Sequence, residues 1–437
     1  MPGIAPATTT TNAPAKTPWG AVLLFCMLFF IFGFVTWLNG PLITFVKLAF
    51  NLTDVEAFLV PSVFYLSYFF LALPSAFILR ATGMKQGMAL GLLIMALGAA
   101  GFGQFATMRI FPGALISLFT IGMGVSLLQT ASNPYISVLG PIESGAQRIA
   151  VMGIFNKGAG FLAPLVVGTL ILHGMGELDA SVKAAATPQA RDAILNAFAA
   201  RIHTPYMIMA ALMAILAVGT WFSPLPKLSD DANPGAGKGL AAAAPQMLFG
   251  FLAIFFYVGV EVLVGDGITT YGNGFHLPLD QTKYFTSLPN VAMLVGYVVG
   301  MIVTPRFVSQ ERYLTFSTLL GMVIAAGALL THGFTSVLFV AALGFANAMM
   351  WPAIFPLGIR GLGKLTEFGG ALLVMGIAGG SIIPQIFAHL KDAYGFQPVY
   401  VALIVICYAY VLFFSLFAGR QGKAQAAAAA AAATGDI

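Results

Sequence analysis

Three ionisable side chains lie within long apolar stretches of the sequence: Lys157, Glu261 and Asp266. A charge at the centre of a membrane helix costs about 2.5 to 3.5 kcal/mol on insertion scales, so such groups face a cavity or a partner. The two carboxylates can be neutralised by a proton or by sodium, and Lys157 can act as their counter-ion. These residues form a candidate site for a coupling cation. The alternative is that Glu261 is a structural partner of Lys157 or of a tyrosine.

The spacing of the two carboxylates constrains the helix that carries them. Five residues of a regular helix rotate by about 140°, so Glu261 and Asp266 would not share a face. Gly259, Gly265 and Gly267 surround them in the sequence. We therefore expect a local break in this helix, which would bring the two groups together.

Amide and aromatic side chains form a second candidate group. Gln129 and Asn133 are four residues apart, as are Asn347 and Trp351, so each pair shares one face of a helix. Amides donate and accept hydrogen bonds, which suits the hydroxyls of a neutral polyol. The alternative role of these amides is hydrogen bonding between membrane helices. The expected substrate-contacting residues are Trp37, Asn39, Gln129, Asn133, Asn156, Tyr257, Asn290, Asn347, Trp351 and Gln385, with Tyr271 and Tyr297 as further aromatic candidates.

The composition sets the environment in which these residues must work. Of 437 residues, 59% are hydrophobic and only 8% are charged, against about 25% charged in soluble proteins. This excludes a soluble domain and a nucleic-acid-binding surface. The two cysteines, Cys26 and Cys407, lie in apolar runs and exclude a disulfide framework. The sequence has no catalytic triad, phosphate-binding loop or zinc-protease motif, so we expect no enzyme activity, no metal centre and no cofactor.

A membrane-spanning helix needs about 20 mainly apolar residues, and the sequence contains twelve such windows. They predict an all-α polytopic membrane protein with two six-helix bundles. The windows are 19–46, 57–80, 86–108, 111–139, 149–173, 204–223, 246–273, 283–304, 313–333, 335–358, 368–390 and 397–419.

The chain divides into two bundles joined by a polar linker. The expected segments are a disordered cytoplasmic tail (1–18), a first bundle (19–223), a cytoplasmic linker (224–245), a second bundle (246–420) and an Ala-rich cytoplasmic tail (421–437). Lys and Arg favour the cytoplasmic side of a membrane. Twelve of the 20 fall on one side if both termini are cytoplasmic, which predicts that orientation.

The two halves resemble copies of each other. Val-Met-Gly-Ile at 151–154 recurs at 374–377 after a short basic loop, and a similar offset aligns Asn39 with Glu261. Repeats of this kind are typical of transporters that bind their substrate between the halves near the bilayer midplane.

Four motifs resemble the fucose, galactose and hexose branch of the major facilitator superfamily. They begin at Asn39 (Asn-Gly-Pro-Leu), Gln129 (Gln-Thr-Ala-Ser-Asn-Pro-Tyr), Phe155 (Phe-Asn-Lys-Gly) and Tyr257 (Tyr-Val-Gly-Val-Glu-Val). The resemblance covers residues 19–420 and implies a bacterial inner membrane and cation-coupled uptake of a monosaccharide. Glucose/galactose and N-acetylglucosamine transporters of this branch fit best.

One departure from the branch concerns the coupling acids. Fucose members carry carboxylates at the positions that are Gly40 and Gln129 in this sequence. The resemblance therefore places cation coupling on Glu261 and Asp266, together with Lys157. In one form of this coupling, the two carboxylates bind sodium. Two other functions stay open: a passive sugar facilitator, and a sugar-sensing receptor or exporter on the same fold. The expected partners are a sugar, a proton or sodium ion and the lipid bilayer, with the chain as a monomer.

Overall fold

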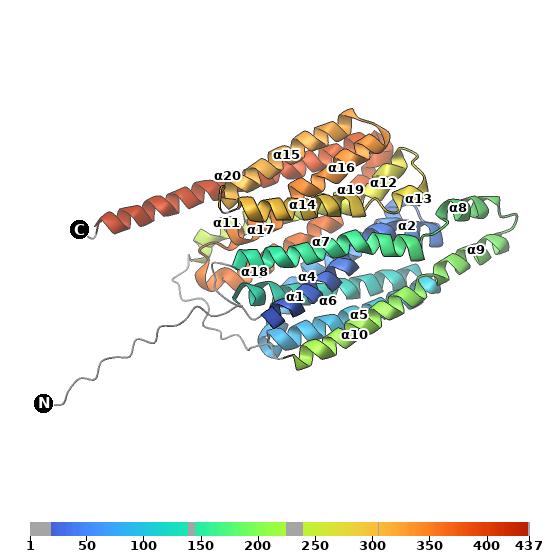
Figure 1. The fold of residues 1–437 in the computed structure, drawn as a ribbon, viewed down its shortest axis with the longest axis horizontal. Helices are drawn as coiled ribbons and strands as arrows, with labels where there is room; N and C mark the ends of the chain where they lie inside the picture. The colour runs from blue at the N-terminus through green and yellow to red at the C-terminus, as the bar shows by residue number, and fades with distance from the viewer. Residues whose placement is uncertain (1–18, 139–144, 224–238, 305, 436–437) are drawn as a thin grey trace.

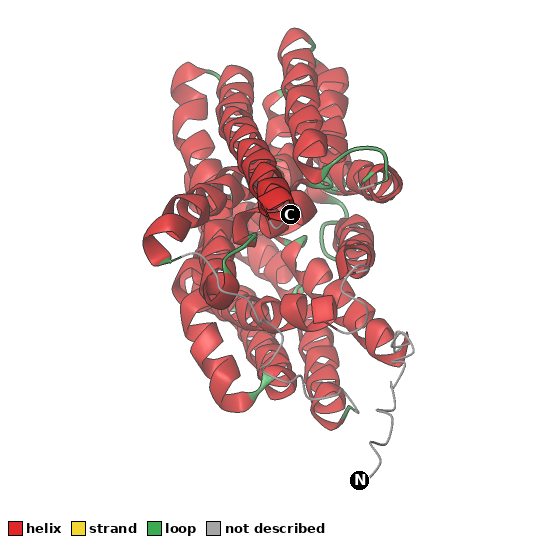
Figure 2. Cartoon of the chain, turned by 90° about the vertical axis from the view of Figure 1, so that its left-hand side faces the viewer, coloured by secondary structure: helices red, strands yellow, loops and turns green. Residues whose placement is uncertain are grey.

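The structure is a computed structural model that describes residues 19–138, 145–223, 239–304 and 306–435. Within these ranges it contains 12 helical segments long and apolar enough to cross a membrane, which confirms the expected fold class. In Figure 2, the described part of the chain consists of helices joined by loops. The helices run roughly along the long axis of the molecule (Figure 1).

The first half of the chain contains ten helices. These are α1 (Trp19–Thr36), α2 (Asn39–Ala49), α3 (Asp54–Ala57), α4 (Leu59–Thr82), α5 (Met84–Thr107), α6 (Phe111–Val138), α7 (Gly145–Leu170), α8 (Met175–Ala184), α9 (Pro188–Ala200) and α10 (His203–Phe222). The helices α8 and α9 lie between the expected spans 149–173 and 204–223 (Figure 1).

The second half begins with α11 (Leu240–Gly265), so residues 240–245 of the expected linker are helical, and residues 224–238 lie outside the described ranges. It continues with α12 (Ile268–Gly274), α13 (Leu279–Thr282), α14 (Ser287–Val303), α15 (Gln310–Leu330), α16 (Gly333–Asn347), α17 (Met350–Ile359), α18 (Thr366–Met375), α19 (Gly379–Tyr394) and α20 (Phe396–Gly435), with short 3₁₀ turns η2 (Gly363–Leu365) and η3 (Gly376–Ala378). The helix α20 includes the Ala run because alanine has the highest helix propensity.

Several spans are broken into two helices, and local sequence explains the breaks. Proline lacks an N–H group and clashes with the carbonyl four residues before it. Pro41 and Pro352 therefore end α1 and α16 before Trp37 and Ala348, and a new helix starts soon afterwards. In the span of α11 and α12 the break falls at Asp266 and Gly267, as the glycines around the carboxylates led us to expect.

The breaks fall at different points of the repeat alignment made from the sequence. The helix after the first break begins at Asn39, and the helix after the break in α11–α12 begins at Ile268, seven residues after Glu261. The correspondence of Asn39 with Glu261 stays a prediction.

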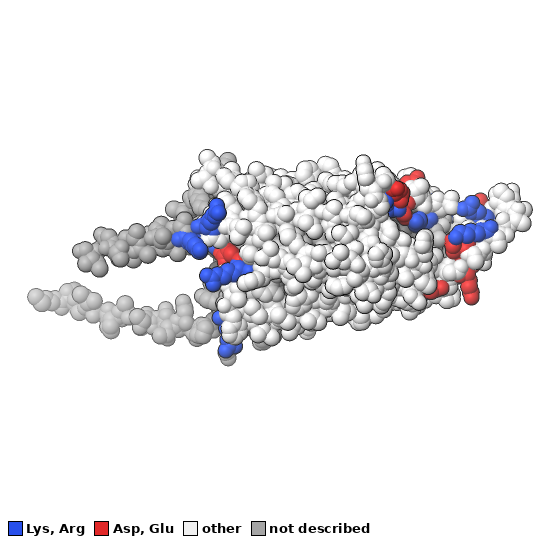
Figure 3. Space-filling model, turned by 90° about the horizontal axis from the view of Figure 1, so that it is seen from above, with Lys and Arg blue, Asp and Glu red and all other residues white. Residues whose placement is uncertain are grey.

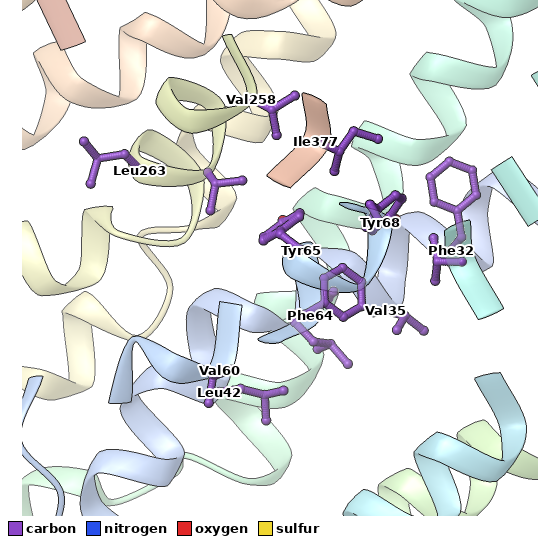
Figure 4. Packing of buried hydrophobic residues seen from close by; sticks show 14 of the residues in the cluster. Phe32, Val35, Leu42, Val60, Phe64, Tyr65, Tyr68, Val258, Leu263 and Ile377 are labelled. Atoms are coloured by element: carbon purple, nitrogen blue, oxygen red, sulfur yellow. The ribbon is translucent and has the colours of Figure 1, made fainter. Parts of the chain in front are cut away.

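Helices of the two halves pack against each other. The helix α7 packs against α14, and α4 packs against α18 and α19. Figure 4 shows the aromatic side chains Tyr65 and Tyr68 of α4 near Val258 of α11 and Ile377 of η3. The core therefore continues across the boundary between the halves.

The surface matches a chain embedded in lipid. Large apolar side chains such as Leu97, Phe222, Val323 and Leu330 are exposed, although a soluble monomer rarely exposes extended apolar surface. In Figure 3 the charged residues gather at the two ends and leave an uncharged band around the middle. We call the end that carries α8 and α9 the loop end, and the end where α1 begins the terminal end (Figure 1).

Candidate functional site

A cavity lies between the two halves of the molecule. Its walls come from α1, α4, α6 and α7 in the first half and from α11, α14, α17 and η3 in the second. The lining residues are Phe29, Phe32, Thr36, Trp37, Tyr65, Tyr68, Gln129, Ile149, Gly153, Asn156, Lys157, Tyr257, Val258, Glu261, Val262, Tyr297, Trp351, Pro352 and Ile377. The lining is mainly aromatic, with two amides, Gln129 and Asn156, and one ion pair among the described residues.

That ion pair joins Lys157 of α7 to Glu261 of α11. The Lys157 Nζ lies 2.6 Å from Glu261 Oε1, and the two side chains are 8% and 13% exposed. The ammonium therefore does not extend to the membrane surface. Because the partners belong to different halves, the pair is a direct electrostatic link across the cavity.

Trp37 holds the lysine from another side. The Lys157 Nζ lies 4.2 Å from the centroid of the Trp37 ring, within the range of a cation–π interaction. The Trp37 Nε1–H donates a hydrogen bond of 3.2 Å to Asn156 Oδ1. The ring reaches this position because Gly265 faces it: a Cβ at Gly265 would lie 2.3 Å from Trp37 Cζ3.

The amides predicted from the sequence have different environments in the structure. Gln129 lines the cavity, and its Nε2 lies 3.5 Å from the Tyr68 hydroxyl, at the outer limit of a hydrogen bond. Asn156 also lines the cavity and accepts from Trp37. The side chain of Asn133 lies outside the part that the structure describes.

Three other predicted amides do not line the described cavity. Asn347 is buried and its Oδ1 accepts a hydrogen bond of 2.6 Å from Tyr408. Asn290 donates to the Thr286 carbonyl at 2.9 Å, one turn earlier on its helix. Gln385 lies toward the loop end and donates to the Val55 carbonyl at 3.3 Å. The contacts of Asn347 and Gln385 connect helices, the alternative role that sequence reasoning had left open, whereas that of Asn290 stays within its own helix.

The aromatic platform is larger than the sequence suggested. Tyr257, Tyr297 and Trp351 line the cavity. Tyr271 does not, because its hydroxyl bonds to Ser336 and its ring packs on Tyr400.

Sequence reasoning missed Tyr65 and Tyr68, which line the cavity from α4. Their spacing of three residues on one helix face was the available signal. An aromatic span has many such pairs, so this spacing alone does not single them out.

Asp266 lies beside the cavity wall and not in the described lining. Its carboxylate is buried, and the Tyr65 hydroxyl lies 3.4 Å from Asp266 Oδ2. Asn39 adjoins the same tyrosine hydroxyl. Glu261 and Asp266 are thus held by different partners, Lys157 and Tyr65.

Polar contacts close the cavity toward the loop end. Lys391 of α19 lies 2.7 Å from Asp54 Oδ2 at the start of α3, and Lys47 of α2 pairs with the other oxygen of Asp54. Lys283 donates to the Leu172 carbonyl at 3.1 Å, between the two halves. These contacts hold the halves together on the loop-end side.

A buried polar cavity between two six-helix halves is the arrangement of a membrane transporter that alternates access between two sides of a bilayer. The Major Facilitator Superfamily profile matches residues 25–384. The chain belongs to this superfamily of transporters, in its fucose/galactose/hexose branch, and not to an enzyme family.

Relatives and solved structures support this assignment. The chain is 31% identical to a glucose/galactose transporter of Brucella abortus over 94% of this chain and 97% of the relative. It is 28% identical to the L-fucose-proton symporter of Escherichia coli, covering 90% and 92%. The transporter FucP in its outward conformation superposes with a TM-score of 0.72 at 26% identity, covering 91% and 98%.

Proposed function

We propose that this protein is a cation-coupled symporter that carries a monosaccharide, a hexose or an N-acetylhexosamine, into the cell by alternating access. The observation that carries the proposal is the cavity between the halves, where neutral amides and aromatic rings surround one ion pair. The names of the relatives support a sugar as substrate and a proton as one candidate cation.

The sugar contacts are assigned to residues of the cavity wall. Gln129 and Asn156 supply donors and acceptors for hydroxyl groups, and Asn133 one turn after Gln129 is proposed to join them. Trp37, Tyr257 and Trp351 supply apolar ring faces. Trp351 is held for this role by stacking on Phe355, with ring centroids 5.6 Å apart.

The remaining predicted contacts are assigned a supporting role. Asn347 and Gln385 connect helices around the cavity, and Asn290 bonds to the turn before it on its own helix. We propose that they act through helix position and not by touching the sugar.

Coupling is assigned to Glu261 with Lys157. The attraction between these charges links the two halves, and it disappears when the carboxylate is neutralised. Neutralisation of Glu261 by a proton therefore frees Lys157 and lets one half move against the other. Coupling requires that sugar and cation, when both are bound, favour the conformation from which the halves move.

The test is uptake by the purified protein in liposomes. Labelled glucose, galactose, mannose and N-acetylglucosamine are supplied with an imposed proton gradient or an imposed sodium gradient. Accumulation above the external concentration under either gradient supports symport and identifies the sugar and the ion. Equilibration alone supports a passive facilitator, and binding without flux supports a sugar sensor.

We propose a bacterial inner membrane as the location, with both termini in the cytoplasm and the chain as a monomer. The excess of Lys and Arg on the terminal side supports the orientation. The loop end then faces outward, so the contacts of Asp54 with Lys391 close the outer side of the cavity. Accessibility of a tag on either terminus in inside-out vesicles tests the orientation.

A further inference from the structure

The charges buried beside the cavity do not balance. Lys157 is paired with Glu261, which leaves Asp266 without an ion pair among the residues that the structure describes. Asp266 is only 1% exposed. An ionised carboxylate in such a place is strongly disfavoured unless a cation or several donors compensate it.

Hydrogen bonds compensate only part of this charge. The Tyr65 hydroxyl lies 3.4 Å from Asp266 Oδ2, and the backbone N–H of Gly40 also interacts with the carboxylate. Its Oδ1 is buried and has no hydrogen-bond partner among the described residues. The carboxylate therefore has room for a further ligand on one oxygen.

Two more buried oxygens without partners come from neighbouring residues. Asn39 Oδ1 and Thr286 Oγ1 are enclosed and make no hydrogen bond within the described structure. Asn39 adjoins the Tyr65 hydroxyl, which itself contacts Asp266. A buried polar atom without a partner costs about 1 to 3 kcal/mol, so three in one place call for an explanation.

Gly40, the residue after Asn39, lies against both Thr286 and Asp266. An ideal Cβ at Gly40 would lie 2.4 Å from Thr286 Oγ1 and 3.3 Å from Asp266 Cα. The chain directly after Asn39 therefore passes between Thr286 and Asp266. Asn39 comes from the first half of the chain, and the other two come from the second half. The cluster is thus shared between the halves, at the two helix breaks.

We propose that Asp266 Oδ1, Asn39 Oδ1 and Thr286 Oγ1 form a binding site for a sodium ion. This inference rests on the proposed function, because it adds a sodium site to the coupling machinery, next to the Lys157–Glu261 pair. Hard cations bind to oxygen ligands of carboxylates, amides and hydroxyls. One sodium ion supplies the missing positive charge and partners for all three oxygens. A proton on Asp266 would neutralise the charge but form only one hydrogen bond.

The location gives this site a role in coupling. Broken helices in transporters commonly place cation sites at the break, where the backbone also offers free carbonyl groups. Here both breaks meet at the boundary between the halves while the loop end is closed. A sodium ion that binds ligands from both halves stabilises that closed arrangement. Its release would allow the loop end to open.

The experiment measures sodium binding directly on the purified full-length protein. Equilibrium binding of radioactive sodium is measured first. The melting temperature in sodium chloride is then compared with the melting temperature in potassium chloride at equal ionic strength. Thr286→Val removes the hydroxyl at nearly constant shape, and Thr286→Ser retains it. Thr318→Val serves as a matched control, because the Thr318 hydroxyl is buried in α15 and bonds only to its own helix.

The proposal predicts saturable sodium binding and a sodium-specific rise in melting temperature for the unmodified protein, for Thr286→Ser and for Thr318→Val. Thr286→Val weakens sodium binding about tenfold or more, and Asp266→Asn abolishes it. The proposal is overturned if the unmodified protein shows no preference for sodium over potassium, a result that needs no variant to fold. It is also overturned if sodium binding survives in Asp266→Asn.

Sodium binding and sugar transport can be contradicted separately. Sodium binding without sugar uptake would contradict the proposed function and leave this site standing. Uptake driven by a proton gradient alone, in a protein that binds no sodium, would contradict the sodium site and leave symport standing.

Discussion

The ammonium of Lys157 lies 2.6 Å from the carboxylate of Glu261, and the two residues belong to opposite halves of the protein. Each half alone would carry an uncompensated charge in the membrane. Joined, the two charges form a link that is sensitive to any change of protonation or ligand at Glu261. This relationship connects the electrostatics of the cavity to the relative position of the halves.

The first prediction concerns the stability of this pair. Removing one partner of a buried ion pair leaves the other charge unpaired and costs about 3 to 5 kcal/mol, whereas replacing both is close to neutral. We expect Lys157→Met and Glu261→Gln each to lower the melting temperature. The double variant should recover most of the loss. Purely additive losses in thermal unfolding would mean that the two side chains do not interact.

The second prediction concerns the hydrogen bond between Trp37 and Asn156. Trp37→Phe keeps an aromatic face for Lys157 but removes the indole N–H that positions Asn156. A hydrogen bond contributes about 0.5 to 1.5 kcal/mol, so we expect the KM for sugar to rise about 2- to 10-fold.

A matched control exists for that variant. Trp221 on α10 is 49% exposed on the outside of the bundle, and Trp221→Phe should leave KM unchanged. Equal effects of the two substitutions would show that the Trp37 result reflects general loss of stability.

The third prediction concerns the contacts that close the loop end. Asp54 bonds to Lys391 of the other half and to Lys47 of its own half. A partly exposed ion pair contributes about 0.2 to 1 kcal/mol, so Asp54→Asn should shift the population toward an open loop end by up to about fivefold. Spin labels at the exposed residues Gln189 of α9 and Gln281 of α13 should report a larger share of long distances.

The control for this variant is Asp179→Asn, because Asp179 pairs with Lys183 inside α8 and does not join the halves. The same distance change in both variants, or no change in Asp54→Asn, would contradict a closing role for Asp54.

Composition was sufficient to predict most of the fold, because the 12 spans follow from apolar length. The break before Asn39 is explained by Pro41, but other prolines, such as Pro74 and Pro164, lie inside continuous helices. Proline positions alone therefore do not predict where a span breaks.

The site was only partly predictable, because residue type does not reveal which way a side chain faces. Asn156 and Asn347 are both buried amides in apolar helices, yet one lines the cavity and the other bonds to Tyr408. The pairing of Lys157 with Glu261 was one of two readings, since 104 residues separate the partners and only the fold brings them together. Tyr65 and Tyr68 were missed for the same reason.

The central claim is that Glu261 couples the cation to sugar movement, and Glu261→Gln tests it most directly. The neutral amide imitates a permanently neutralised carboxylate, so the variant should exchange labelled sugar across liposomes as the unmodified protein does. It should no longer accumulate sugar under an imposed proton or sodium gradient. Accumulation equal to that of the unmodified protein would contradict the account and return Glu261 to a purely structural role.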